Sequence, residues 1–272
     1  MGEKRVVNTM GDGETAKRYL FIFAHPDDEV FIAGTMKQLI TMGHEVYGVW
    51  VTSGEARGGR ELRERELGAA IRIIGLKLER TRLLRLPNRG LLPILGKAVD
   101  AVSDLFEQVV PDRVLVTAYE GGHIDHDAVN FIAHEAAKRT NLAADLLEFP
   151  LYNRNGPAYL MGWKINRFPG KSETVYYNPL TDEAIDVKHQ VMRIYASQWK
   201  DMAPFRLAMP RFRLKLYGEP YRPLSLGRDY TLPPHRGRLN YEGWLFPSGD
   251  IRFRHFKECI MLYRRKHVPP EK

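Results

Sequence analysis

Two short segments of the sequence carry the nitrogen and oxygen donors that a hydrolytic metal site needs. Residues 25–29 read His-Pro-Asp-Asp-Glu, and residues 123–126 read His-Ile-Asp-His. A catalytic zinc ion takes three protein ligands of this kind and keeps a further position for water. The chain has one cysteine, Cys259, so a cysteine-based zinc site cannot be built. Any bound metal is therefore expected on histidine and carboxylate, where zinc or another divalent ion would fit.

The spacing within these segments predicts a metal-activated water with a carboxylate beside it. His25 and Asp28 are three positions apart at a strand-to-helix turn, so both can point at one spot, and a histidine from a second strand end completes a His-Asp-His set. Asp27 is then free to act as general base, because a metal acidifies its bound water and a carboxylate can take the proton. His123 can stabilise the oxyanion or protonate the leaving amine. The alternative interpretation is a plain helix start, in which the aspartates only cap free amides.

Alternating apolar and amphipathic segments indicate how these residues are positioned. Runs typical of buried parallel strands cover residues 19–24, 46–51, 114–118 and 147–152, and helical patterns cover residues 30–42, 60–74, 99–109, 124–140 and 188–198. This alternation predicts a Rossmann-like three-layer α/β/α fold with a mostly parallel sheet. In such sheets the ligand site lies beyond the carboxyl ends of the strands. Segments 25–29, 52–57 and 119–127 are therefore expected to share one rim.

The last third of the chain has a different pattern. Prolines become frequent and helical periodicity fades after residue 200. We predict a catalytic core over residues 18–200 and an irregular or β-rich extension over residues 201–272, packed together as one structural domain. In the extension Arg211, Arg213 and Lys215 alternate with apolar residues, a strand-like period of two. This basic stretch is expected either to contact an anionic, phosphate-bearing or lipid-linked substrate, or to be a half-buried strand with solvated arginines.

The bulk composition limits the classes of partner. A net charge of +8 favours acidic partners such as phosphorylated or lipid-linked substrates, or peripheral contact with a membrane surface. No nucleic-acid partner is expected, because the acidic, histidine-rich rim is the wrong surface for a phosphate backbone. No apolar run reaches the roughly 18 residues of a membrane span, and the polar N-terminus lacks the core of a signal peptide. A cytoplasmic enzyme is expected, and a homo-oligomer is compatible with the sequence.

A different class of protein, a non-catalytic nucleotide- or nucleic-acid-binding α/β module, shares the expected fold. Such a nucleotide-binding module carries a Gly-x-Gly-x-x-Gly phosphate cradle at its first strand-to-helix turn. This chain has His-Pro-Asp-Asp-Glu at that turn, and carboxylates there would repel a pyrophosphate. The sequence therefore favours hydrolysis over plain binding.

The two segments together resemble a known family. Ala-His-Pro-Asp-Asp-Glu at residues 24–29, after the first strand, and His-Ile-Asp-His at residues 123–126 are similar to motifs of the PIG-L/LmbE-type zinc N-deacetylases. These are N-acetylglucosaminyl deacetylases and related amidases. The resemblance covers roughly residues 18–155, with two departures. Ile124 stands where proline is common, and Gly121 stands where some relatives have a tyrosine.

The resemblance implies a hydrolase that removes an acetyl or other acyl group from an N-acetylated amino sugar or glycoconjugate. An amidase of the same chemistry, acting on a sugar-thiol or other glycoside conjugate, stays open. The implied general base is Asp27, with His123 assisting at the oxyanion or leaving amine. Arg63 is implied to face the substrate, with a solvated helix face as the alternative. One zinc ion per chain is implied on His25, Asp28 and His126, with further candidate substrate contacts at Glu55, Asp125 and Tyr152.

Overall fold

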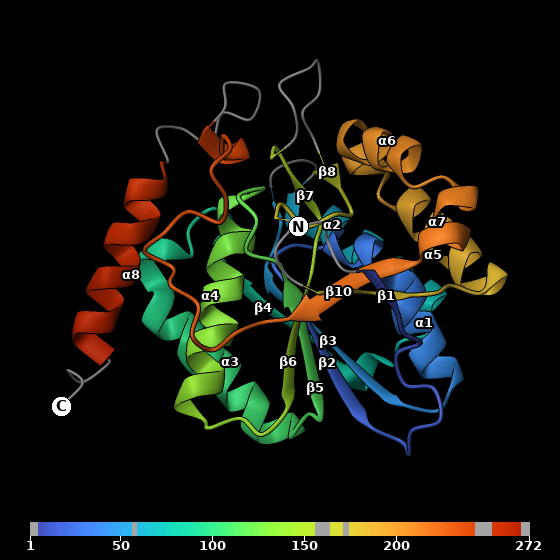
Figure 1. Ribbon diagram of the computed structural model, residues 1–272, viewed down its shortest axis with the longest axis horizontal. Coiled ribbons are helices and arrows are strands. Elements are labelled where there is room, and N and C mark those ends of the chain that lie inside the picture. The colour runs from blue at the N-terminus through green and yellow to red at the C-terminus, as the bar shows by residue number, and fades with distance from the viewer. Residues whose placement is uncertain (1–4, 56–58, 156–163, 171–173, 243–251, 268–272) are drawn as a thin grey trace.

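The computed structural model describes residues 5–55, 59–155, 164–170, 174–242 and 252–267. Its centre is an eight-stranded sheet in the order β1-β9-β10-β6-β5-β2-β3-β4, with a separate two-stranded pair, β7 and β8 (Figure 1). The strands are β1 Arg5–Val7, β2 Arg18–Phe23, β3 Glu45–Thr52, β4 Thr81–Leu86, β5 Arg113–Thr117, β6 Asp145–Phe149, β7 Tyr152–Asn153, β8 Lys164–Ile165, β9 Val175–Asn178 and β10 Glu219–Pro223. Strands β2 to β6 are all parallel to one another, and β10 is antiparallel to both of its neighbours, β9 and β6.

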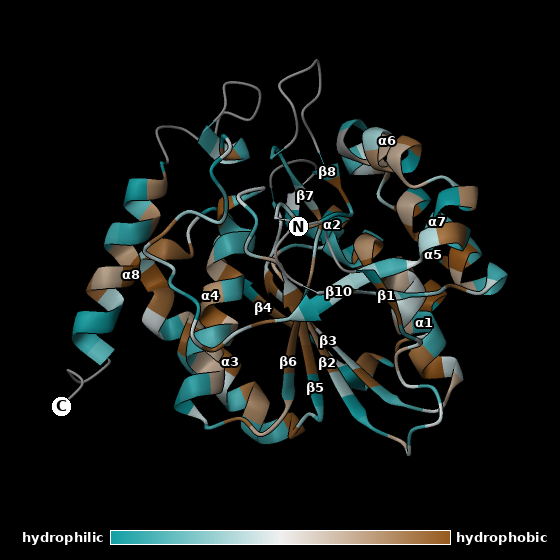
Figure 2. Cartoon of the chain, in the orientation of Figure 1, coloured by the Kyte–Doolittle hydropathy of each residue, from teal (hydrophilic) through white to brown (hydrophobic). Residues whose placement is uncertain are grey.

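Helices cover both faces of the sheet. The helices are α1 Ala33–Thr41, α2 Gly59–Ile74, α3 Leu95–Val109, α4 Ile124–Arg139, α5 Asp182–Ile194, α6 Trp199–Ala208, α7 Arg211–Tyr217 and α8 Phe253–His267. Helices α1, α2 and α5 pack together over one face, and α3, α4 and α8 pack over the other. Figure 2 shows hydrophobic residues concentrated on the central strands and on the helix surfaces turned toward them. The predicted three-layer α/β/α fold with a mostly parallel sheet is therefore confirmed.

The strand order creates a switch point beside β2. The first strand of the parallel part, β2, lies between β5 on one side and β3 on the other. The connection after β2 leads to β3 and the connection after β5 leads to β6, so these two connections run in opposite directions across the sheet. Residues 19–24 are fully buried, because this central strand is covered on both faces. Loops that leave a sheet at such a point diverge to opposite faces and open a crevice between them. The segments after β2 and β5 border this crevice.

The C-terminal extension is built into the sheet. Its strand β10 lies between β9 and β6. A buried ion cluster reinforces this junction: the Glu148 carboxylate on β6 accepts hydrogen bonds from Arg222 Nε at 2.6 Å and from Arg228 Nη2 at 2.7 Å. The division of the chain at residue 200 stays a prediction.

The predicted strand over residues 211–216 is wrong, because these residues form helix α7. Only Leu214 of this helix is buried, so the sequence alternation does not correspond to a buried strand face. Arg211 and Lys215, one helical turn apart, instead pair with Asp182 and Asp186 on α5. Among the described helices, none is long and apolar enough to cross a membrane.

Candidate functional site

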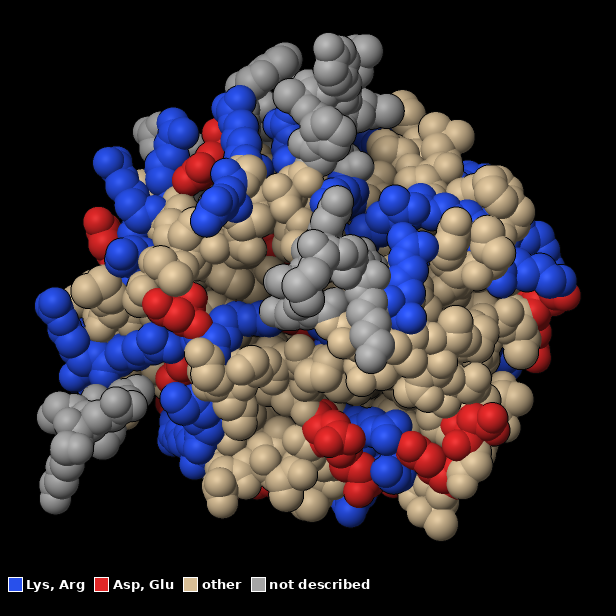
Figure 3. All heavy atoms as spheres, viewed as in Figure 1, with Lys and Arg blue, Asp and Glu red and all other residues tan. Residues whose placement is uncertain are grey.

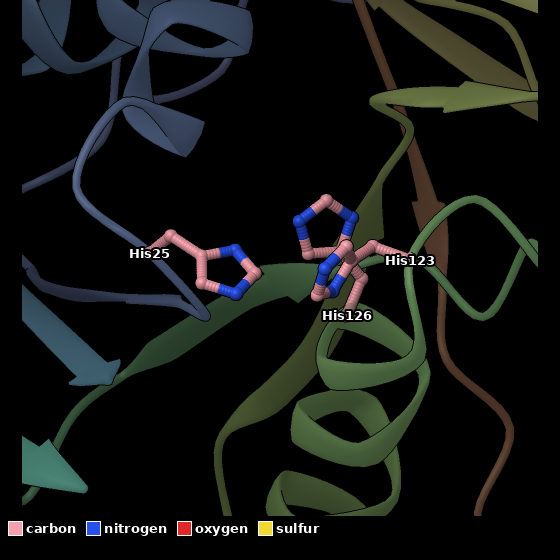
Figure 4. A group of neighbouring side chains, drawn as sticks. All are labelled: His25, His123 and His126. Atoms are coloured by element: carbon pink, nitrogen blue, oxygen red, sulfur yellow. The ribbon is translucent and has the colours of Figure 1, made fainter. Parts of the chain in front are cut away.

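A pocket lies at the carboxyl ends of β2 and β5, where the sequence places its histidines and aspartates. The loop after β2 carries His25, Asp27 and Asp28 into it, and the loop after β5 with the first turn of α4 carries His123 and His126. Figure 4 shows the three imidazole rings converging from these two chain segments. The predicted segments thus meet at one rim although about 100 positions separate them.

The three histidines can hold a metal ion. Each offers a ring nitrogen, and these nitrogens all lie within 4.8 Å of one another. The Asp28 carboxylate stands among them, with Oδ1 at 3.1 Å from His126 Nε2 and Oδ2 at 3.7 Å from His25 Nδ1. His126 Nδ1 is buried without a hydrogen-bond partner in the described part of the chain. A buried imidazole nitrogen lacking a partner and a carboxylate between two imidazoles fit a divalent cation.

Asp125 lies behind His25 and does not line the pocket. Its Oδ2 is 3.1 Å from His25 Nε2 and also accepts a hydrogen bond from the Arg89 backbone amide at 2.6 Å. A carboxylate on one imidazole nitrogen fixes the ring, so the other nitrogen faces the site. The side chain is 1% exposed, which leaves it little access to a substrate.

Asp27 is held at the pocket by Arg63, which is 1% exposed. Arg63 Nη2 donates to Asp27 Oδ2 at 2.7 Å and to the Pro26 carbonyl, and Arg63 Nε donates to the Gly54 carbonyl at 3.2 Å. Asp27 has a φ of 101°, which a non-glycine residue seldom adopts and which its surroundings must therefore impose. Its amide donates to Glu29 Oε2 at 3.0 Å. Burial raises the pKa of the Asp27 carboxyl, and the charge of Arg63 opposes that shift.

His123 caps helix α4 and faces the pocket with its other nitrogen. Its Nδ1 accepts a hydrogen bond from the Asp125 amide at 3.1 Å, so in the neutral ring the proton resides on Nε2. Burial, together with the neighbouring His25 and His126, lowers the pKa of His123 well below its usual range. The ring is therefore a neutral hydrogen-bond donor toward the pocket.

Apolar side chains form one wall of the pocket. It is formed by Phe31, Tyr152, Met202 and Phe205. Phe205 stacks on Tyr152 with ring centroids 5.5 Å apart and meets Phe31 edge-on at 4.9 Å. Of this wall, the sequence indicated only Tyr152. Met202 and Phe205 of α6 could not be predicted from the sequence, because their segment has little amphipathic pattern and contains a proline.

Of the remaining candidate substrate contacts, Arg63 lines the pocket and Glu55 does not. Arg63 is also buried and paired with Asp27, so the alternative of a solvated helix face is wrong. Glu55 does not line the pocket; its carboxylate accepts from Ser53 Oγ at 2.9 Å and from Arg60 Nε at 2.7 Å. Three polar residues that the sequence did not indicate, Asn88, Arg89 and Gln198, line it as well.

Together, the fold and the site define an α/β/α protein with a candidate metal centre at the switch point of its parallel sheet. Residues 20–137 match the family model PIG-L, described as GlcNAc-PI de-N-acetylase. This segment contains most of β2, all of β5 and both histidine motifs. Over this segment, which is less than half of the chain, the sequence is similar to that family. None of the curated proteins matches it in sequence.

Several solved structures share the fold. A deacetylase of teicoplanin biosynthesis superposes with a TM-score of 0.61 at 17% identity, over 76% of this chain and 97% of that one. An N,N'-diacetylchitobiose deacetylase from Pyrococcus horikoshii has a TM-score of 0.56 at 23% identity, over 77% and 84%. A 4-carboxy-2-hydroxymuconate hydratase from Pseudomonas putida KT2440 has a TM-score of 0.52 at 17% identity, over 74% and 87%. Because these enzymes differ in reaction, the likeness establishes the fold and leaves the activity to the site.

Proposed function

We propose that this protein is a metal-dependent hydrolase that removes an acetyl group from an N-acetylated amino sugar or glycoconjugate. The observation that carries the proposal is the convergence of His25, Asp28 and His126 with a separately held carboxylate, Asp27, in one pocket. The PIG-L match over residues 20–137 supports the same reaction class. So do the deacetylases of teicoplanin biosynthesis and of diacetylchitobiose among the structures that share the fold.

The proposed metal ligands are His25, Asp28 and His126, with one Zn²⁺ ion per chain. His123 belongs to the same cluster, but its Nδ1 already accepts a hydrogen bond from the Asp125 backbone amide. Asp28 instead contacts both other ligands, which favours it as the third. A bound divalent ion would acidify a water molecule and polarise the amide carbonyl.

The other residues of the pocket supply the proton transfers. Asp27 is proposed to take the proton of the attacking water and to return it to the leaving amine, because its carboxylate faces the pocket and Arg63 fixes its direction. His123, neutral and with a proton on Nε2, is proposed to donate a hydrogen bond to the oxyanion. This neutral donor would take over from the tyrosine that Gly121 replaces.

The apolar wall is proposed to hold the substrate against the site. Tyr152 and Phe205 present stacked aromatic rings suited to the face of a sugar or to its acyl group. Asn88 and Gln198 offer amide groups to substrate hydroxyls. A sugar-thiol conjugate would use the same machinery, so it belongs in any substrate panel.

The test is to measure metal content and acetate release together. The purified chain would be assayed on N-acetylglucosamine, chitin oligomers, and N-acetylglucosamine linked to inositol, phosphate, lipid or a thiol conjugate, with and without chelator. Chelator-sensitive release with about one metal per chain supports the proposal. Bound metal with cleavage of another amide only would keep the metal site and refute the deacetylase assignment. Absence of both metal and hydrolysis after zinc reconstitution would refute the whole proposal.

A further inference from the structure

Tyr195, the residue that follows helix α5, contacts both of the groups that hold Asp27. Its side chain is fully buried, and its hydroxyl donates a hydrogen bond to Glu29 Oε1. The guanidinium carbon of Arg63 lies over its ring, 5.3 Å from the ring centroid. Glu29 accepts a hydrogen bond from the Asp27 amide, and Arg63 binds the Asp27 carboxylate. One tyrosine therefore touches the support of the Asp27 backbone and the support of its side chain.

The hydroxyl of Tyr195 completes the hydrogen bonding of the buried Glu29 carboxylate. Glu29 Oε2 accepts from the Asp27 amide at 3.0 Å and from Trp50 Nε1 at 3.0 Å, and Oε1 accepts from Tyr195. Burial and the Glu29 carboxylate raise the pKa of Tyr195 well above its usual range, so the hydroxyl keeps its proton and donates. Because a buried carboxylate oxygen without a donor is costly, this hydroxyl helps to fix the orientation of Glu29 that the Asp27 amide requires.

The ring of Tyr195 and the residues after it restrain Arg63. An aromatic face attracts a guanidinium group and limits its movement. Arg63 Nη1 also lies 3.6 Å from Glu66 Oε2. The Glu66 carboxylate in turn accepts hydrogen bonds from the Ser197 amide at 2.8 Å and from the Ser197 hydroxyl at 2.6 Å. The segment that begins at Tyr195 is thereby tied to the same arginine twice.

The same segment leads into the apolar wall of the pocket. Residues 196–198 form a short 3₁₀ helix, and α6 follows with Met202 and Phe205 of the wall. Figure 3 shows mostly uncharged side chains over the region where α6 lies in Figure 1, whereas the carboxylates of Glu29 and Glu66 hold the start of the segment from inside. The wall and Asp27 therefore share one buried anchor, Tyr195.

We propose that Tyr195 is a positioning residue for the general base, which it holds through Glu29 at the Asp27 backbone and through Arg63 at the Asp27 carboxylate. The inference rests on the proposed function, because it takes Asp27 as the base. Tyr195 itself does not line the pocket, so it acts through Asp27 and not on the substrate. The left-handed conformation of Asp27 costs free energy and persists only where its surroundings impose it, and Tyr195 is part of those surroundings. The family match ends at residue 137 and assigns Tyr195 no role.

The kinetic test is steady-state acetate release by Tyr195→Phe, which loses the hydroxyl but keeps the ring over Arg63. The matched control is Tyr230→Phe, because Tyr230 is equally buried and donates to Asn130 Oδ1 at 2.6 Å, and neither of these two residues lines the pocket. We expect kcat of Tyr195→Phe to fall about tenfold with KM and metal content unchanged, because a misplaced base slows the reaction without weakening substrate binding. The control should keep its kcat although its melting temperature falls to a similar degree. An equal loss of kcat in the two variants would overturn the proposal.

A double variant asks whether Tyr195 acts through Asp27. In Asp27→Asn the base is removed, so the addition of Tyr195→Phe should not lower the residual kcat further. Effects that are independent of each other would multiply. A loss of kcat on adding Tyr195→Phe that is as large in Asp27→Asn as in wild type would therefore overturn the proposal.

Crystal structures of the zinc-loaded variants test the positioning role without any substrate. Tyr195→Leu removes the hydroxyl and the ring, so we expect the Asp27 carboxylate to leave Arg63 or to occupy more than one conformation. In Tyr230→Phe the contact from Arg63 Nη2 to Asp27 Oδ2 should stay at 2.7 Å. An unchanged Asp27 in every Tyr195 variant that folds, the milder Tyr195→Phe included, would overturn the proposal. A wild type that releases no acetate would refute the proposed function alone, because the displacement of Asp27 is measured independently of activity.

Discussion

Replacing Arg63 by methionine tests whether Arg63 positions the general base or binds the substrate. In the structure the guanidinium is buried and makes its contacts within the protein, to Asp27 and to the carbonyls of Pro26 and Gly54. Methionine fills a similar volume but leaves the Asp27 carboxylate without its cation and both carbonyls without a donor. We therefore expect kcat to fall and KM to change little.

The magnitude follows from these three contacts. Breaking a buried ion pair by removing one partner costs about 3–5 kcal/mol, and Asp27 is still about a fifth exposed, so we expect about 3 kcal/mol of lost stability. General base catalysis contributes about 10²–10⁴ in rate, and a base that has lost its orientation should forfeit about 10² or more of it. Arg63→Lys, which cannot reach all three acceptors, should lie between wild type and methionine.

The assay is steady-state acetate release with metal content and denaturant unfolding measured on the same samples. Arg60→Met is the matched control, because Arg60 lies on the same helix, is exposed and pairs only with Glu55 among the described residues. It should leave kcat and stability unchanged. A rise in KM at constant kcat in Arg63→Met would refute the positioning role and restore the substrate-facing role that the sequence suggests.

Three further predictions concern the base, the ligand support and the buried ion cluster. Asp27→Asn should keep the metal but lose about 10²–10⁴ in kcat, and a fully active variant would remove Asp27 from the base role. Asp125→Asn should weaken metal affinity about 10–100-fold in a chelator competition, because the variant loses the carboxylate that holds His25 Nε2 and so orients the ring; unchanged affinity would contradict that support. Burial alone would raise the pKa of Glu148, but its two arginine partners outweigh it and lower that pKa to about 2. This stabilisation is fully present above pH 4.5, the pKa of the unfolded state, and is lost as the pH falls toward about 2. The free energy of unfolding of wild type should therefore fall by about 3 kcal/mol across that window, and Glu148→Gln should lack this pH dependence. An equal pH dependence of the two proteins in acid unfolding would contradict the role of the cluster.

The parallel core could be predicted because its signals are local. Strands such as β2 and β5 are short apolar runs, and the residues that follow each of them must leave the sheet at the same edge. By contrast, β10 contains Pro220 and Pro223, and proline argues against a strand inside a sheet because it cannot donate to the ladder. Its place between β9 and β6 is fixed by partners more than 40 positions away, which no local pattern reports.

The residues of the site likewise fall into those that a local sequence pattern predicts and those that only tertiary contacts place. The histidines and aspartates are recognisable by type and spacing, since few side chains bind metals. Arg63 stands in a run of charged residues that reads as a solvated helix face, and its burial follows from a partner 36 positions away. Phe205 likewise joins the pocket wall only because α6 folds back over Phe31 and Tyr152. Tertiary contacts of this kind leave no periodic signal in the sequence.

The shared fold does not decide the reaction, so the proposed amide hydrolysis rests on the arrangement around Asp27. A hydratase and two deacetylases have similar folds, so a sheet with a switch-point crevice is compatible with several chemistries. Amide hydrolysis by this mechanism needs a carboxylate that faces the attacking water but is not itself a metal ligand. In this chain Asp28 turns to the histidines, whereas the neighbouring Asp27, in its left-handed conformation, turns to Arg63. That backbone conformation points two adjacent carboxylates at different partners, which allows one to bind a metal while the other accepts a proton.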